Sequence, residues 1–178
     1  PASIDVPGFL PDVPEVRSDL ADYMYEIQWF DRHLGQMLDR LEREGQLENT
    51  LVIVTSDNGM SFPRAKANLY EFGIHMPLAV AWPARIPAGQ QNDDLVSLID
   101  VTRTIFSAAK VTPAQPERLS GFDLLPRIGD AADKASPARS AVFSGRERHS
   151  SSRFRTLGYP CRCVRTQTHL YIRNFTPE

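Results

Sequence analysis

The feature that most constrains the fold is a short apolar run that ends in polar residues. Residues 51–55 are Leu-Val-Ile-Val-Thr, and after Ser56 they are followed by Asp57, Asn58 and Gly59. An aliphatic, β-branched run without alternation predicts a strand buried on both faces, as in a parallel sheet. In open α/β sheets, ligands bind beyond the carboxyl ends of the strands. We therefore expect an α/β fold with polar chemistry where this strand ends.

The residues after this strand have two interpretations. A carboxylate and an amide, on Asp57 and Asn58, with the nearby cation Lys66, suit a hard divalent cation that holds an oxyanion. The sequence Asp-Asn-Gly is also common in turns, because Asn and Gly accept positive φ angles and Asp caps the next segment. Spacing alone leaves the metal site and the turn about equally favoured.

A long helix is expected before the strand. Apolar residues recur at helical spacing from Leu20 to Leu41, with Ser18 as a good N-cap and Gly45 at the end. Three prolines between residues 7 and 14 predict an extended lead-in instead of an earlier helix start. Helix and strand together form an α/β unit.

The middle of the chain is expected to continue this architecture. Residues 76–82 predict a second strand, and residues 95–99 predict a short third one. Asp100 is placed to cap a following helix, so we assign it a structural role. Residues 111–139 are rich in proline and predict an irregular connection.

The end of the chain predicts a small antiparallel sheet. Residues 141–145 form a strand candidate, and residues 161–166 and 169–174 form a hairpin candidate. We place a subdomain boundary near residue 140, which divides the chain into residues 1–139 and 140–178. Cys161 and Cys163 are too close in sequence for an easy disulfide, so we assign them as ordinary strand residues.

Composition excludes some partners. A net charge of −2 without a basic block argues against nucleic acid. No apolar run has the length of a membrane span, and residues 1–5 lack the pattern of a signal peptide. The compartment and the oligomeric state stay open.

Four segments in order resemble the sulfatase family, and in particular its sulfamidase-like (heparan N-sulfatase-like) branch. The segments are Thr55-Ser56-Asp57-Asn58-Gly59, Phe62-Pro63-x-x-Lys66-x-Asn68-Leu69-Tyr70, Gly73-Ile74-x-Met76-Pro77-Leu78 and Tyr171-Ile172-Arg173-Asn174-Phe175. The resemblance implies the later part of an α/β/α sandwich of alkaline-phosphatase type, followed by the small antiparallel sheet. It also implies hydrolysis of a sulfate ester or a sulfamate, on a sulfated small molecule or sulfated sugar.

The same resemblance assigns roles to residues. Asp57 and Asn58 match ligands of a divalent cation, which is usually Ca²⁺, with Mg²⁺ as the alternative. Lys66 matches the basic residue that binds the sulfate. Glu147 and His149 match a segment near the substrate pocket, although a surface charge cluster is the competing interpretation.

One family motif is missing from these 178 residues. The nucleophile of sulfatases is a formylglycine made from the first residue of Cys/Ser-x-Pro-x-Arg, and the near matches at residues 61–64 and 161–165 each lack a required position. We expect the nucleophile-bearing portion to lie outside this chain and the chain alone to be inactive. Two alternatives remain, a phosphoryl hydrolase of the same fold and a truncated metal-binding segment without catalysis.

Overall fold

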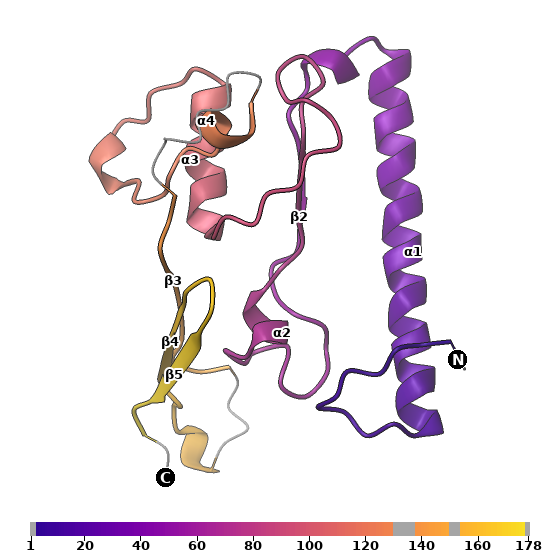
Figure 1. The fold of residues 1–178 in the computed structure, drawn as a ribbon, viewed down its shortest axis with the longest axis vertical. Helices are drawn as coiled ribbons and strands as arrows, with labels where there is room; N and C mark the ends of the chain where they lie inside the picture. Colours follow the sequence, from indigo (N-terminus) through magenta and orange to yellow (C-terminus); the bar gives the residue numbers. More distant parts are fainter. Residues whose placement is uncertain (1–2, 130–137, 150–153, 177–178) are drawn as a thin grey trace.

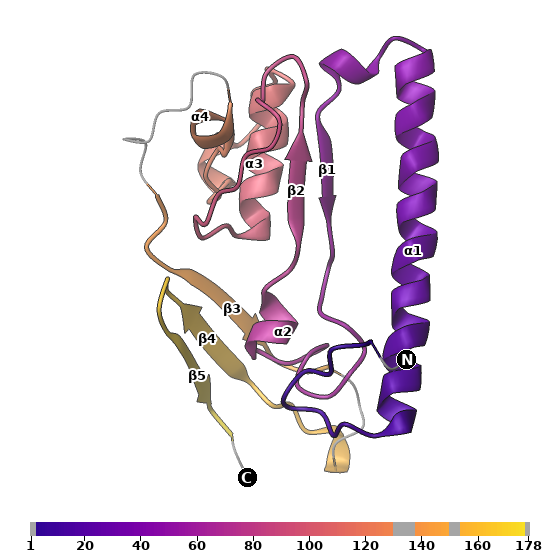
Figure 2. The ribbon, with the colours of Figure 1, turned by 45° about the vertical axis from the view of Figure 1, so that its right-hand side comes forward.

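The computed structural model describes residues 3–129, 138–149 and 154–176. Its first part has three layers. Helix α1 (Pro14–Arg43) and helix α3 (Leu98–Ala108) lie on opposite sides of a sheet that contains strands β1 (Val52–Thr55) and β2 (Leu78–Ala81) (Figures 1 and 2). This helix–sheet–helix order is an α/β/α arrangement, as the sequence predicts.

The pairing of β1 differs from the prediction. β1 is antiparallel to β2, with Val52 opposite Ala81 and Thr55 opposite Leu78, and none of its residues is fully buried. After β1 the chain passes through a loop and the short helix α2 (Glu71–Ile74) and then returns beside the strand it left (Figure 2). A parallel partner would need a crossover connection instead. The expectation of a doubly buried, parallel strand is therefore wrong for the described part of the chain.

Helix α1 begins earlier than Ser18, the predicted N-cap. Val13 is the N-cap and Pro14 occupies the first turn, where proline is tolerated because its missing N–H would have no partner in the helix. The predicted end is confirmed, since Gly45 follows the helix with a φ of +67°. The α1 face, as we call its exposed apolar stripe, consists of Tyr23, Met24, Ile27, Phe30 and Met37, which are 36–64% exposed.

The start of α3 corrects a second prediction. Ser97 is the N-cap, and the carboxylate of Asp100 reaches back to accept a hydrogen bond from the Ser97 N–H at 2.8 Å. The helix therefore occupies Leu98 and Ile99, and the strand expected at residues 95–99 is wrong. The structural role of Asp100 is confirmed, because it is only 1% exposed and also accepts from the Phe122 N–H at 2.7 Å. Three shorter helical segments are also present: the 3₁₀ helix Leu47–Asn49 joins α1 to β1, and the 3₁₀ helix Pro116–Arg118 and α4 (Leu125–Ile128) follow α3.

The last part of the chain forms the predicted antiparallel sheet. Strands β3 (Val142–Arg146), β4 (Cys161–Arg165) and β5 (Leu170–Asn174) are ordered β3-β4-β5, and a 3₁₀ segment, Phe154–Thr156, precedes β4. Cys161 and Cys163 are free, buried strand residues, as expected. Burial raises the pKa of the Cys163 thiol. The boundary near residue 140 falls just before β3 and stays a prediction.

Residues 60–68, which carry Lys66, form a loop that we call the Lys66 loop, and Leu69, directly after it, joins the core of this sheet. It packs with Cys161 and Cys163, and these three residues are 3–8% exposed. Partly buried apolar residues surround them: Ile74, Tyr159, Leu170 and Ile172. Among the described residues, no helix has the length and apolar character needed to cross a membrane.

Candidate functional site

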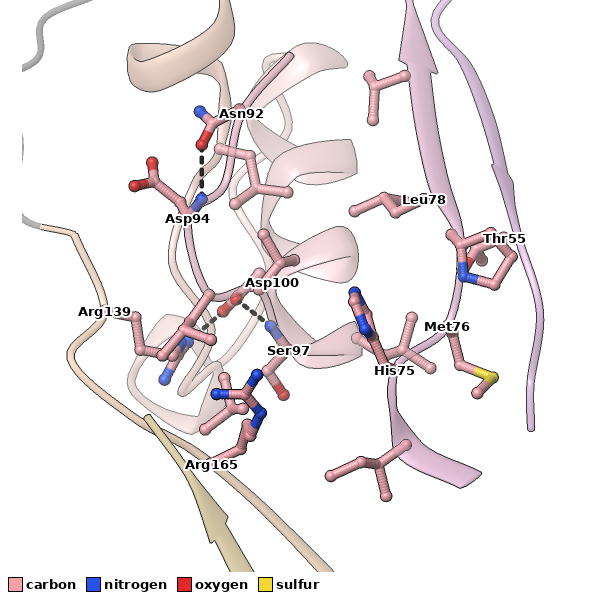
Figure 3. Close-up of a pocket in the computed structure, with 18 of the residues that line it drawn as sticks. Thr55, His75, Met76, Leu78, Asn92, Asp94, Ser97, Asp100, Arg139 and Arg165 are labelled. Atoms are coloured by element: carbon pink, nitrogen blue, oxygen red, sulfur yellow. Dashed lines mark hydrogen bonds and ion pairs between the residues drawn. The ribbon is translucent and has the colours of Figure 1, made fainter. Parts of the chain in front are cut away.

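A cavity of about 1520 Å³ lies between the two parts of the chain. Its lining comes from the end of β1, from α2 and β2, from the start of α3 and from β3. Figure 3 shows Arg139 and Arg165 entering this region from different segments, toward the start of α3 and its Asp100. The cavity therefore collects polar side chains from segments that are distant in sequence.

Asp57 and Asn58 both line the cavity. They follow β1 directly, so the strand fixes where they leave the sheet. Asp57 is exposed and Asn58 is partly exposed. Among the described residues, neither side chain forms a hydrogen bond or ion pair; the backbone carbonyl of Asn58 accepts from the Ser56 hydroxyl at 2.8 Å. Their oxygens are thus available to a ligand.

Two glycines allow the backbone around these residues to pack closely. A Cβ on Gly59 would lie 2.0 Å from the Phe72 carbonyl oxygen, and one on Gly73 would lie 2.2 Å from the Asn68 carbonyl oxygen. Both distances are too short for any side chain. The turn after β1, the Lys66 loop and α2 are therefore stacked backbone against backbone.

Lys66 is exposed and does not line the cavity. Its backbone N–H donates to the Met60 carbonyl at 3.0 Å, which closes the loop after Gly59. Its own carbonyl accepts from the Asn68 side-chain amide at 3.1 Å. The loop thus brings the Lys66 backbone to Met60, two residues after Asn58, while the ammonium group stays in solvent.

Glu147 and His149 lie just beyond β3, and both are exposed. His149 lines the cavity and Glu147 does not. The Glu147 carboxylate forms an ion pair with Arg162 of β4, and its carbonyl accepts from the Tyr159 N–H at 2.8 Å. Of the two predicted substrate-binding residues, only His149 therefore lines the cavity, whereas the Glu147 side chain is paired with Arg162.

An ion-paired cluster borders the cavity on the side of the C-terminal sheet. Arg165 of β4 contacts both carboxylate oxygens of Glu71, at 3.0 and 3.3 Å, and His75 lies 3.1 Å from the same carboxylate. The hydrogen bond from Arg165 is the main cause of the lowered pKa of Glu71, and the positive charge of Arg165 contributes further. This cluster fastens α2 to β4.

The described residues do not form a complete metal site. Nowhere in the described ranges do three or more His, Cys, Asp or Glu side chains gather in a metal-binding group. A carboxylate and an amide oxygen fit a hard cation, but Ca²⁺ takes about six to eight oxygen ligands. Asp57 and Asn58 can therefore fill a fraction of such a shell.

Sequence reasoning missed some residues that build the site. Arg146 donates to the Ala67 carbonyl, beside Lys66, and the close contact of Gly59 with Phe72 was not foreseen. Both contacts join segments whose pairing no local pattern reveals. The position of Arg146 at the end of a predicted strand was the one available signal.

Comparison with solved structures defines the class of fold. A protein solved in complex with its substrate D-glucosamine-2-N,6-O-disulfate superposes with a TM-score of 0.65 and 24% sequence identity, over 83% of this chain and 30% of that one. The fold is thus a partial α/β/α sandwich of the alkaline-phosphatase and sulfatase type, with a small antiparallel sheet, as the sequence predicts.

Sequence comparison then identifies the family. A family model described as Sulfatase matches residues 5–111, and one described as N-sulphoglucosamine sulphohydrolase, C-terminal, matches residues 64–173. The chain therefore belongs to the sulfatase family.

Two curated relatives match almost the whole chain. Human N-sulphoglucosamine sulphohydrolase is 33% identical over 98% of this chain and 34% of its own length. The ulvan-active sulfatase of Formosa agariphila is 28% identical over 98% of this chain and 27% of its own length. The chain thus spans only 27–34% of the length of these relatives.

Proposed function

We propose that this chain supplies part of the active site of a hydrolase that removes sulfate from an ester or a sulfamate on a sulfated sugar. The observation that carries the proposal is the pair of uncommitted oxygen donors, Asp57 and Asn58, that lines a large cavity at the end of β1. The names of the relatives support it, because they include a sulphoglucosamine sulphohydrolase and a polysaccharide sulfatase. The neighbouring structure holds a sugar with N- and O-linked sulfate.

In this proposal, Asp57 and Asn58 hold a divalent cation, Ca²⁺ with Mg²⁺ as the alternative. The cation supplies positive charge against the sulfuryl oxygens. The carboxylate of Asp57 contributes the charge that binds it, and the amide of Asn58 contributes a neutral oxygen. Because two donors leave the coordination shell incomplete, further ligands are expected from residues outside this chain.

Lys66 is proposed to bind the sulfate group itself. Its ammonium group is exposed at the end of a closed loop and has no ion pair within the described residues. A cation held in place before the reaction stabilises charge on sulfuryl oxygens while the bond to sulfur breaks. His149, on the cavity wall, and Glu147, already paired with Arg162, are proposed contacts to the sugar.

The nucleophile, a formylglycine, is expected from a segment outside these residues. We therefore predict that the purified chain does not hydrolyse an aryl sulfate or glucosamine N-sulfate. Turnover that disappears in Asp57→Ala would show that the chain is complete by itself and would overturn this part of the proposal.

The roles of the site residues are tested in a longer protein, in which this chain follows a sulfatase segment with the Cys/Ser-x-Pro-x-Arg motif. Asp57→Ala and Lys66→Ala should each lower kcat/KM for the sulfated sugar by about 10²–10³. Asp39→Asn, an exposed carboxylate on α1, is the control and should leave it unchanged. Full activity of both site variants would contradict the proposal, and faster cleavage of the matching phosphate ester would favour a phosphoryl hydrolase.

A further inference from the structure

The loop that carries Lys66 has an unusual backbone. Arg64 and Ala67, on either side of it, have φ angles of +59° and +61°. Side chains other than glycine rarely adopt this left-handed region, and such residues persist only where the surrounding structure holds them. The loop therefore needs contacts that fix it.

Some of those contacts lie within the loop and its neighbours. Ala65 is completely buried, and its carbonyl accepts from the Asn68 N–H at 3.0 Å. A Cβ on Gly73 would lie 2.4 Å from the same carbonyl oxygen, so α2 presses directly on the loop backbone. These contacts fix residue 65 but leave the carbonyl of Ala67 to another donor.

That donor comes from the C-terminal sheet. Arg146, the last residue of β3, donates from its guanidinium to the Ala67 carbonyl oxygen. The guanidinium lies over the ring of Tyr159 at 5.4 Å, and its other terminal nitrogen is 3.8 Å from the Cys161 sulfur. Its Nε is buried without a hydrogen-bond partner among the described residues. The charged end of Arg146 is thus directed at the loop and forms no ion pair with a described residue.

We propose that Arg146 is a positioning residue, which orients Lys66 by holding the left-handed turn at Ala67. The role of Lys66 in binding sulfate rests on the proposed function, whereas the hold on the loop rests on the contacts above. It follows that the C-terminal sheet, besides completing the fold, sets the geometry of the sulfate-binding lysine.

The test compares Arg146→Met, Arg146→Lys and the control Arg173→Met in the 178-residue chain. Methionine keeps an apolar stem over Tyr159 but removes the donors, whereas lysine keeps a positively charged group that donates hydrogen bonds. Arg173 lies on β5 of the same sheet and is exposed, with its guanidinium 4.9 Å from the Phe175 ring. The first readout is amide hydrogen exchange of residues 65–69.

In Arg146→Met these amides should exchange about tenfold faster, because a hydrogen bond from a charged donor is lost. Arg146→Lys should recover much of the protection, and Arg173→Met should match the unaltered chain. Amides of β4 and β5 should not change in any variant. Equal exchange at residues 65–69 in Arg146→Met and Arg173→Met would overturn the proposal, as would a failure of lysine to restore protection that methionine removes.

The second readout is the affinity for inorganic sulfate, measured by NMR titration. Arg146→Met and Lys66→Ala should both weaken it, and Arg146→Lys should restore it. Unchanged affinity in Lys66→Ala would contradict the proposed function and leave the positioning of the loop supported by exchange. Unchanged affinity in Arg146→Met alone would contradict the positioning role.

Discussion

The α1 face and the inner face of the C-terminal sheet differ in how far they bury their apolar side chains. On the α1 face, Ile27, Phe30 and Met37 are 49%, 54% and 64% exposed. At the C-terminal sheet, Leu69 and Cys161 are 8% and 3% exposed. The three-stranded sheet thus closes a core together with Leu69 and with Ile74 of α2, whereas α1 presents an apolar stripe that its own sheet does not cover.

The candidate site adjoins the C-terminal sheet and not the α1 face, since its cavity is lined by β3 and by Arg165 of β4 but by no residue of α1. Asp57 and Asn58 follow β1. The Lys66 loop contacts both regions: Phe62 packs edge-on against Tyr23 of the α1 face, and Ala67, with Leu69 directly after the loop, contacts the C-terminal sheet. Exposed apolar stripes mark surfaces that interact. The α1 face therefore has the character of an interaction surface, which the buried core at the C-terminal sheet lacks.

The largest expected effect concerns the buried cluster at the C-terminal sheet. Leu69→Ala should lower the free energy of unfolding by about 2–5 kcal/mol, because it leaves a cavity in a buried cluster. Met37→Ala, on the α1 face, should change it by less than about 0.5 kcal/mol. Urea unfolding followed by circular dichroism measures both. Equal losses of unfolding free energy in Leu69→Ala and Met37→Ala would contradict the distinction between the two regions.

A smaller effect concerns the tie between α2 and β4. Arg165 lowers the pKa of Glu71 below its ordinary value of 4.5. The ionised carboxylate therefore stabilises the fold at pH values above 4.5, and this stabilisation is lost as the pH falls below 4.5 and through the lowered pKa. Glu71→Gln should therefore lower the thermal midpoint at pH 7. The cost should stay below about 1 kcal/mol because the pair is partly exposed, and the difference should shrink below pH 4.5.

The exposed ion pair of Arg40 and Glu44 at the C-terminal end of α1, at 2.9 Å, is the matched control. Glu44→Gln should leave the midpoint at pH 7 unchanged. If the difference in thermal midpoint between Glu71→Gln and the unaltered chain became larger as the pH was lowered, the assigned role of Glu71 would be contradicted.

The elements that follow from local patterns could be predicted from the sequence. Alternation along residues 161–174 predicted the hairpin of β4 and β5, and helical spacing predicted most of α1. The predicted start of α1 was wrong because a proline can occupy the first turn. The strand expected at residues 95–99 was wrong because Asp100 binds back to Ser97 and the helix starts there.

The arrangement of the site was only partly predictable. The position of Asp57 and Asn58 on a cavity follows from the end of a strand in an α/β fold. The antiparallel return of β2 and the contact between Arg146 and Ala67 depend on packing between distant segments. No periodicity or spacing in the sequence carries that information.

The central claim is that Asp57 and Asn58 bind a divalent cation, and a CaCl₂ titration of the chain followed by amide NMR tests it most directly. We predict chemical-shift changes concentrated at residues 55–59, with a dissociation constant of about 10⁻³ M because the coordination shell is incomplete. These changes should be lost in Asp57→Asn and retained in Asp39→Asn. Shifts that persist in Asp57→Asn, or that are absent from residues 55–59, would contradict the account.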